Sequence, residues 1–232
     1  MPTGQIVAMG GGGFSMEPEN PRLDRYVLSL ARSPVPRVCF LNPANSADYF
    51  YRFYQAFGLE KCRTNHLDLC RLPSADLRGW LLEQDVIYVG GGNTRSMMAQ
   101  WREWGLPEIL SECHDQGAVL AGLSAGMICW YDWGLTDSVP GTLGPLKCAG
   151  LLSGGAVPHF DGEAERRPSA HELVGSGILP DSVAADDSAA LVYRDRVLSE
   201  VVSSVEGRRA YRLTREGDRC VETPLEARLL GT

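Results

Sequence analysis

Short apolar segments and segments of helical periodicity alternate along the first two thirds of the chain. Five apolar runs bounded by Gly, Pro or polar residues are typical of buried strands: 5–10, 37–43, 65–69, 85–93 and 118–122. Amphipathic helical spacing is found between them, in 21–31, 49–58, 94–105 and 106–117. Strands separated by helices of this length predict βαβ units and therefore a mostly parallel sheet.

The pattern changes near residue 183. Residues 189–202 (AALVYRDRVLSEVV) and 208–214 (RRAYRLT) alternate between apolar and polar positions, which is typical of antiparallel strands or hairpins. The chain contains no internal repeat and no low-complexity linker. We therefore expect residues 1–232 to form one three-layer α/β domain, with antiparallel strands near its C-terminal end.

The composition limits which classes of partner and which cellular compartment we expect. The net charge of −7 argues against a nucleic acid or an anionic membrane as partner. Seven cysteines are scattered without a CxxC pair, so we expect reduced thiols and a cytoplasmic location. We recognise no secretory signal and no apolar run of 18 residues, and so expect no transmembrane helix.

Three predicted strands end in glycine-rich turns, at 10–13, 90–93 and 122–126. Ligands of open α/β sheets bind outside the carboxyl ends of the strands, so these turns are candidate binding sites. The third turn, Gly-Leu-Ser-Ala-Gly, places Ser124 between two glycines after a buried strand and before 127–133, a segment capable of forming a helix. This pattern fits a nucleophile elbow, but it also fits a serine that caps a helix in a tight turn.

A nucleophilic serine needs a general base and an acid that orients the base. Of the four histidines, His66 lies in a predicted strand, and we expect His114 and His171 on solvated helix faces. His159 follows the apolar run AVP and should lie at a strand end. Four aspartates remain open as the orienting acid: Asp137, Asp161, Asp186 and Asp187.

Several motifs in order resemble the peptidase E family. They are VGGGNT at 89–94, GLSAG at 122–126 and PHFD at 158–161, with 31 residues from Asn93 to Ser124. The family comprises aspartyl dipeptidases, and cyanophycinases are more distant relatives. The resemblance implies a flavodoxin-like fold related to class I glutamine amidotransferases. It also implies Ser124 as nucleophile, His159 as base, and an oxyanion hole formed by the N–H groups of Gly92 and Ala125.

The resemblance points to Asp187 as the orienting acid, where many relatives have Glu, with Asp137 as the alternative. It also implies a basic residue that binds the aspartyl carboxylate of the substrate. Arg166 falls nearest to the family's arginine, ahead of Arg167, and Arg95 and Asn93 are further candidates for substrate binding.

We therefore predict a serine peptidase that cleaves dipeptides or short peptides after an N-terminal aspartate, as a monomer or homodimer and without a metal or organic cofactor. Three alternatives remain. A cyanophycinase-like hydrolase would act on acidic isopeptides or esters. A glutamine-amidotransferase-like enzyme would normally have cysteine in place of Ser124 and His-x-Glu in place of His-x-Asp. A non-enzymatic module would bind a small anion in the glycine-rich turns.

Overall fold

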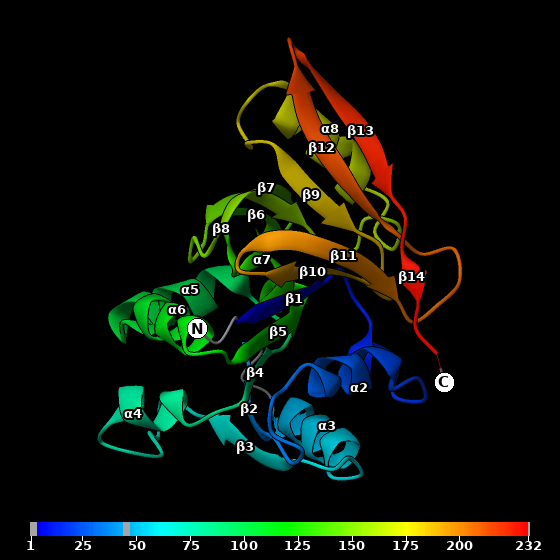
Figure 1. Ribbon diagram of the computed structural model, residues 1–232. Helices are drawn as coiled ribbons and strands as arrows, with labels where there is room; N and C mark the ends of the chain where they lie inside the picture. The colour runs from blue at the N-terminus through cyan, green and yellow to red at the C-terminus, as the bar shows by residue number, and fades with distance from the viewer. Residues whose placement is uncertain (1–3, 44–46, 232) are drawn as a thin grey trace.

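The computed structural model describes residues 4–43 and 47–231. Its main sheet has eight strands in the order β14-β11-β10-β1-β5-β4-β2-β3 (Figure 1). The bounds are β1 Gln5–Met9, β2 Arg37–Leu41, β3 Arg63–Leu67, β4 Val86–Val89, β5 Val119–Leu123, β10 Ala189–Arg194, β11 Val197–Ser203 and β14 Arg228–Leu229. Strands β1 to β5 are parallel, whereas β10 runs antiparallel to β1 and β11 antiparallel to β10.

Helices cover both faces of this sheet. They are α1 Gly13–Met16, α2 Arg22–Ser29, α3 Ala47–Phe57, α4 Leu77–Leu82, α5 Thr94–Glu103, α6 Leu106–Asp115 and α7 Ala125–Ile128. The helix α8 Arg166–Gly175 packs instead against the second sheet described below. Successive side chains of β4 point to opposite faces of the sheet and show which helices cover each face. Val86 and Tyr88 pack with α2 and α3, whereas Ile87 and Val89 pack with α5 and α6. Figure 1 shows these helices on opposite sides of the sheet, as the predicted three-layer α/β architecture requires.

A second sheet of six strands lies next to the part of the main sheet that contains β10 and β11 (Figure 1). Its order is β13-β12-β9-β8-β6-β7, with bounds β6 Tyr131–Val139, β7 Thr142–Lys147, β8 Leu152–Val157, β9 Ser182–Ala185, β12 Ala210–Glu216 and β13 Arg219–Leu225. The antiparallel pairs β10–β11 and β12–β13 confirm the expectation for 189–202 and 208–214.

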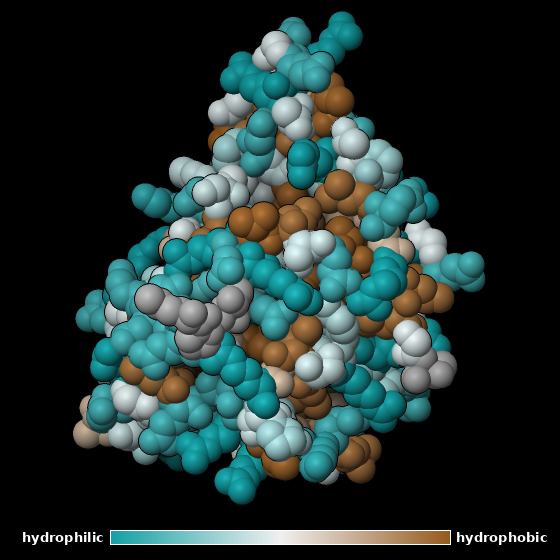
Figure 2. Space-filling view, viewed as in Figure 1, coloured by the Kyte–Doolittle hydropathy of each residue, from teal (hydrophilic) through white to brown (hydrophobic). Residues whose placement is uncertain are grey.

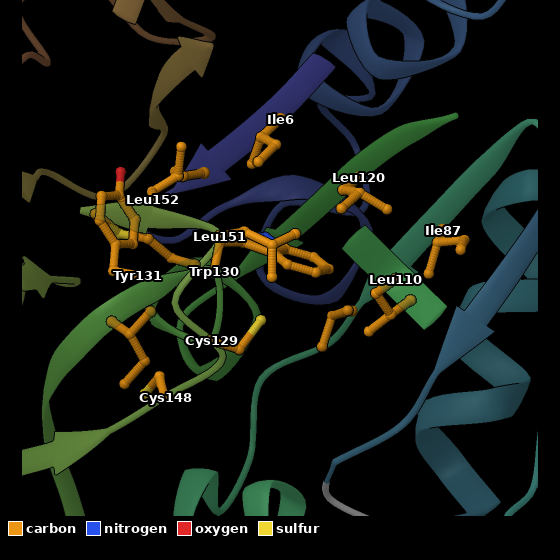
Figure 3. Close-up of a cluster of buried hydrophobic side chains, with 14 of the residues drawn as sticks. Ile6, Ile87, Leu110, Leu120, Cys129, Trp130, Tyr131, Cys148, Leu151 and Leu152 are labelled. Atoms are coloured by element: carbon orange, nitrogen blue, oxygen red, sulfur yellow. The ribbon is translucent and has the colours of Figure 1, made fainter. Parts of the chain in front are cut away.

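The segment 127–133 differs from the prediction. It was expected to form a helix, but α7 ends at Ile128 and β6 begins at Tyr131. Trp130 and Tyr131 are fully buried in the core on the α5–α6 side, so packing overrides the local helical pattern. Figure 3 shows part of this core, where Ile6, Ile87 and Leu120 of the main sheet lie near Leu110 and Trp130.

The surface differs in character from these cores. The face drawn in Figure 2 is mostly hydrophilic, and hydrophobic residues show on it in smaller groups, mainly across the middle. No helix in the described part of the chain has both the length and the apolar character that crossing a membrane requires.

Candidate active site

The carboxyl end of β1 holds three turns of the chain in one place. Three consecutive carbonyl oxygens each accept a backbone hydrogen bond of 3.2 Å: Met9 from Ser124, Gly10 from His159, and Gly11 from Ser188. Ser188 directly follows Asp187, so the turns that carry Ser124, His159 and Asp187 meet at this strand end. The glycines at 10–13 thus organise the other turns.

Ser124 lies on a strained connection between β5 and α7. Its φ of 56° and ψ of −113° are unusual for a residue with a side chain. The flanking glycines make the turn possible, because a Cβ on Gly122 would collide with the carbonyl of Gly126 and a Cβ on Gly126 with that of Val89. This is the geometry of a nucleophile elbow.

Two backbone N–H groups beside Ser124 have no acceptor among the residues that the structure describes. One belongs to Ala125, the first residue of α7, and the other to Gly92. The neighbouring Gly91 N–H is already donated to the Tyr49 hydroxyl at 2.8 Å. Gly91 itself lies against the elbow, since a Cβ built on it would be 3.4 Å from Ser124 Cβ. The N–H groups of Ala125 and Gly92, predicted from the sequence to form an oxyanion hole, are therefore not used by the described residues.

His159 and Asp187 form a close pair. His159 Nδ1 lies 2.6 Å from Asp187 Oδ1, and the histidine side chain is only 10% exposed. Asp187 fits between two glycines, because a Cβ on either Gly11 or Gly162 would collide with its carboxylate. No hydrogen bond joins Ser124 Oγ to His159 within the described residues. Such bonds are often long without substrate and tighten when it binds.

The other candidate aspartates have different partners. Asp161 Oδ1 accepts the Asp187 N–H at 2.8 Å and its other oxygen pairs with Arg208. Asp186 Oδ2 accepts the Arg209 N–H at 3.1 Å, and Asp137 lies 3.4 Å from Arg166. Among the four aspartates, Asp187 alone is hydrogen-bonded to His159 in the described structure.

The two arginines singled out for substrate binding differ in accessibility. Arg166 is buried, at 2% exposed. Its guanidinium contacts Glu163 at 2.6 Å, the Leu135 carbonyl at 2.9 Å and Asp137 at 3.4 Å. Arg95, in the first turn of α5, is exposed, and its side chain has no partner among the described residues.

Two further polar residues near these arginines have protein partners. Asn93 caps α5 by accepting the Ser96 N–H at 3.0 Å, and its amide donates to the Ser138 carbonyl at 2.9 Å. Arg167 pairs with Glu222 at 2.8 Å, and its guanidinium lies over the Phe160 ring.

The remaining histidines lie outside this cluster. His66 is in β3 and contacts Tyr54, and His171 on α8 contacts Glu222. The expectation that His114 is solvated was wrong: it is 2% exposed. Gly4 packs directly against its ring and carbonyl, a contact between distant segments that helical periodicity does not reveal.

An open hollow of about 390 Å³ borders the elbow. Gly91, Gly92 and Leu123 line one side of it, and Tyr49 and Arg52 of α3 line another. A larger hollow of about 710 Å³ lies between α2 and the C-terminal segment, and no candidate residue named above lines it. No three His, Cys, Asp or Glu side chains of residues 4–43 and 47–231 are grouped to hold a metal ion.

The strand order defines the fold class of the protein. It is an α/β protein with a flavodoxin-like fold of the type found in class I glutamine amidotransferases. Within this class, the chain belongs to peptidase family S51, whose family model matches residues 6–201. The protein is therefore a serine peptidase, and the resemblance to peptidase E is confirmed at the level of the family.

One relative agrees with this family assignment, and two solved structures share the fold. The chain is 48% identical over 229 residues to the uncharacterized peptidase YgaJ of Bacillus subtilis (strain 168), covering 98% of this chain and 99% of that protein. A crystal structure of a peptidase from an acI-B1 Actinobacterium matches 97% of this chain and 95% of its own, with a TM-score of 0.68 and 15% identity. A structure from Listeria monocytogenes EGD-e, provisionally assigned to peptidase E, matches 87% of this chain and 98% of its own, with a TM-score of 0.63 and 15% identity.

Proposed function

We propose that this peptidase hydrolyses dipeptides or short peptides with an N-terminal aspartate, through an acyl-enzyme on Ser124. The observation that carries the mechanism is the 2.6 Å contact between His159 Nδ1 and Asp187, held at the strand end that also holds the Ser124 turn. A histidine fixed in this way presents its other ring nitrogen for proton transfer.

The proposed steps follow from these positions. Ser124 Oγ attacks the scissile carbonyl while His159 Nε2 takes its proton, and Asp187 stabilises the imidazolium that forms. The N–H groups of Ala125 and Gly92 stabilise the oxyanion, an interaction worth about 2.7–4 kcal/mol per donor. His159 then protonates the leaving amine, and water hydrolyses the acyl-enzyme by the same route in reverse.

Two arginines, Arg95 and Arg166, support an acidic substrate. Asn93 and Arg95 follow the glycine turn at 90–92, which carries the proposed oxyanion donor Gly92. The exposed Arg95 guanidinium is available to bind a carboxylate. The longest of the three Arg166 contacts is the one to Asp137, whose side chain is 65% exposed. A substrate carboxylate that displaced Asp137 would meet an arginine already held by Glu163 and Leu135.

We also propose that the enzyme works in the cytoplasm, as a monomer or homodimer, on small peptides rather than on nucleic acids or membranes. All seven cysteines are free, which suits a reducing compartment. The net charge of −7 disfavours polyanionic partners.

Hydrolysis of aspartyl p-nitroanilide, beside its glutamyl and leucyl analogues, tests the proposal. We expect cleavage of the aspartyl compound, little cleavage of the others, and loss of activity in Ser124→Ala. Equal cleavage of all three compounds would contradict the aspartate preference but keep the peptidase. If none is cleaved, the dipeptidase proposal is wrong, and acidic isopeptides and esters become the next substrates to test.

A further inference from the structure

The glycine turn after β4 uses its three N–H groups in different ways. Gly90 N–H continues the sheet by donating to the Leu41 carbonyl at 3.0 Å. Gly91 N–H donates to the Tyr49 hydroxyl at 2.8 Å. Gly92 N–H has no acceptor among the described residues. The turn is therefore anchored through the N–H groups of Gly90 and Gly91, and the N–H of Gly92 is left to bind another group.

Tyr49 is held firmly on the outer side of this turn. It is the third residue of α3, and its ring packs against Phe14 at 5.6 Å and edge-on against Phe40 at 5.4 Å between centroids. A Cβ on Gly90 would lie 2.7 Å from the Tyr49 ring, so glycine at this position lets the ring lie against the turn's backbone. Burial raises the pKa of Tyr49, which keeps its phenol neutral, and Ser15 also hydrogen-bonds to it.

A run of three glycines has more backbone freedom than any other tripeptide. Rotation of the Gly91–Gly92 peptide would turn the Gly92 N–H away from Ser124, and the oxyanion would lose one of its two donors. Because the Tyr49 hydroxyl accepts the Gly91 N–H, it fixes the adjacent peptide plane and opposes that rotation.

We propose that Tyr49 is a positioning residue for the oxyanion hole, acting through the Gly91 N–H to hold the Gly92 N–H toward the reacting carbonyl. This rests on the proposed role of Gly92. An interaction that forms with the oxyanion acts in the transition state, so its loss lowers kcat and leaves KM nearly unchanged.

Tyr49→Phe removes the hydroxyl and keeps the ring in the aromatic cluster. Deleting an oxyanion donor outright costs about 100- to 1000-fold in kcat, so we expect misplacing one to cost roughly 10- to 100-fold. Tyr54→Phe is the matched control, because Tyr54 lies on the same helix but its hydroxyl contacts His66 at 2.6 Å, away from the turn. We expect this control to retain wild-type kcat.

Two readouts separate this inference from the substrate proposal. The first is kcat and KM on the aspartyl p-nitroanilide. The second is the rate at which a small fluorophosphonate modifies Ser124, which also develops charge on an oxygen but needs no aspartyl group. A fall in both kcat and the modification rate supports the inference, and a fall in the modification rate alone supports it even if the aspartyl compound is not a substrate. Wild-type rates in Tyr49→Phe, a raised KM at unchanged kcat, or an equal loss in Tyr54→Phe would overturn it.

Discussion

At the scale of single residues, the position of Asp187, the proposed orienting acid, is the most informative feature of the candidate site. Aspartate is one methylene shorter than glutamate, yet Asp187 reaches His159 at 2.6 Å. Gly11 and Gly162 explain the reach, because both lack the Cβ that would collide with this carboxylate. Asp161 accepts a hydrogen bond from the Asp187 N–H and so helps to hold the turn that carries Asp187.

Sequence reasoning singled out Ser124, His159 and Asp187 as candidates but not Tyr49, for a physical reason. Ser124 follows β5 of the main sheet, whereas His159 and Asp187 follow β8 and β9, two neighbouring parallel strands of the second sheet. The strand-end position of each residue was visible in the sequence, but the meeting of the two sheets at the end of β1 was not. Tyr49 was not identified as a site residue, because its ring is one of several aromatic residues in α3 and its hydroxyl meets a glycine 42 residues away. Only tertiary structure reveals that contact.

At the scale of elements, the carboxyl end of β1 holds the turns of the candidate site together. Its last carbonyls bind the Ser124 and His159 turns, and the glycines that follow allow Asp187 to approach closely. The strands β1, β2, β4 and β5 were predictable because each is a short and almost wholly apolar run. The polar strand β3, Arg63–Leu67, was found only in part, as 65–69. The β6–β7 hairpin was not predictable, because Tyr131–Val139 mixes buried and exposed positions without strict alternation.

Gly11→Ala tests the role of this strand end. The added Cβ would collide with Asp187 and press on His159, so we expect kcat/KM to fall at least 100-fold while the protein stays folded. Gly144→Ala in β7 is the control, because a Cβ there meets no atom within 4 Å and should leave activity intact. Circular dichroism and the rate on aspartyl p-nitroanilide measure both effects. Full activity in Gly11→Ala would show that the Asp187 position is not critical.

At the scale of the whole molecule, one buried carboxyl makes stability depend on pH. Asp24 of α2 is 4% exposed and lies against Gly13 of the turn at 10–13. Its carboxyl accepts a hydrogen bond from the Tyr88 hydroxyl at 2.9 Å. Burial raises the pKa of Asp24 from 3.8 to about 7. The folded protein therefore keeps this proton over a range of pH in which the unfolded chain has lost it.

The sign of the pH effect follows from this difference. The contribution of Asp24 is fully present below about pH 4 and is lost as the pH rises through about 7, by roughly 4 kcal/mol at most. Asp24→Asn keeps an acceptor for Tyr88 and removes the titration. Urea unfolding between pH 4.5 and 8 should therefore show the wild type losing stability relative to the variant. Parallel curves for the two proteins would contradict the shifted pKa.

The central claim is that Ser124 is a nucleophile activated by His159 and Asp187, and fluorophosphonate labelling tests it without assuming a substrate. Mass spectrometry would locate the phosphonyl group and give its rate of attachment in the wild type, Asp187→Asn and Asp137→Asn. We predict a single label on Ser124, slowed by about 10⁴-fold in Asp187→Asn, the loss known when the triad aspartate is replaced by Asn, and unchanged in Asp137→Asn. A label at another residue, or slowing in Asp137→Asn instead of Asp187→Asn, would contradict the proposed triad.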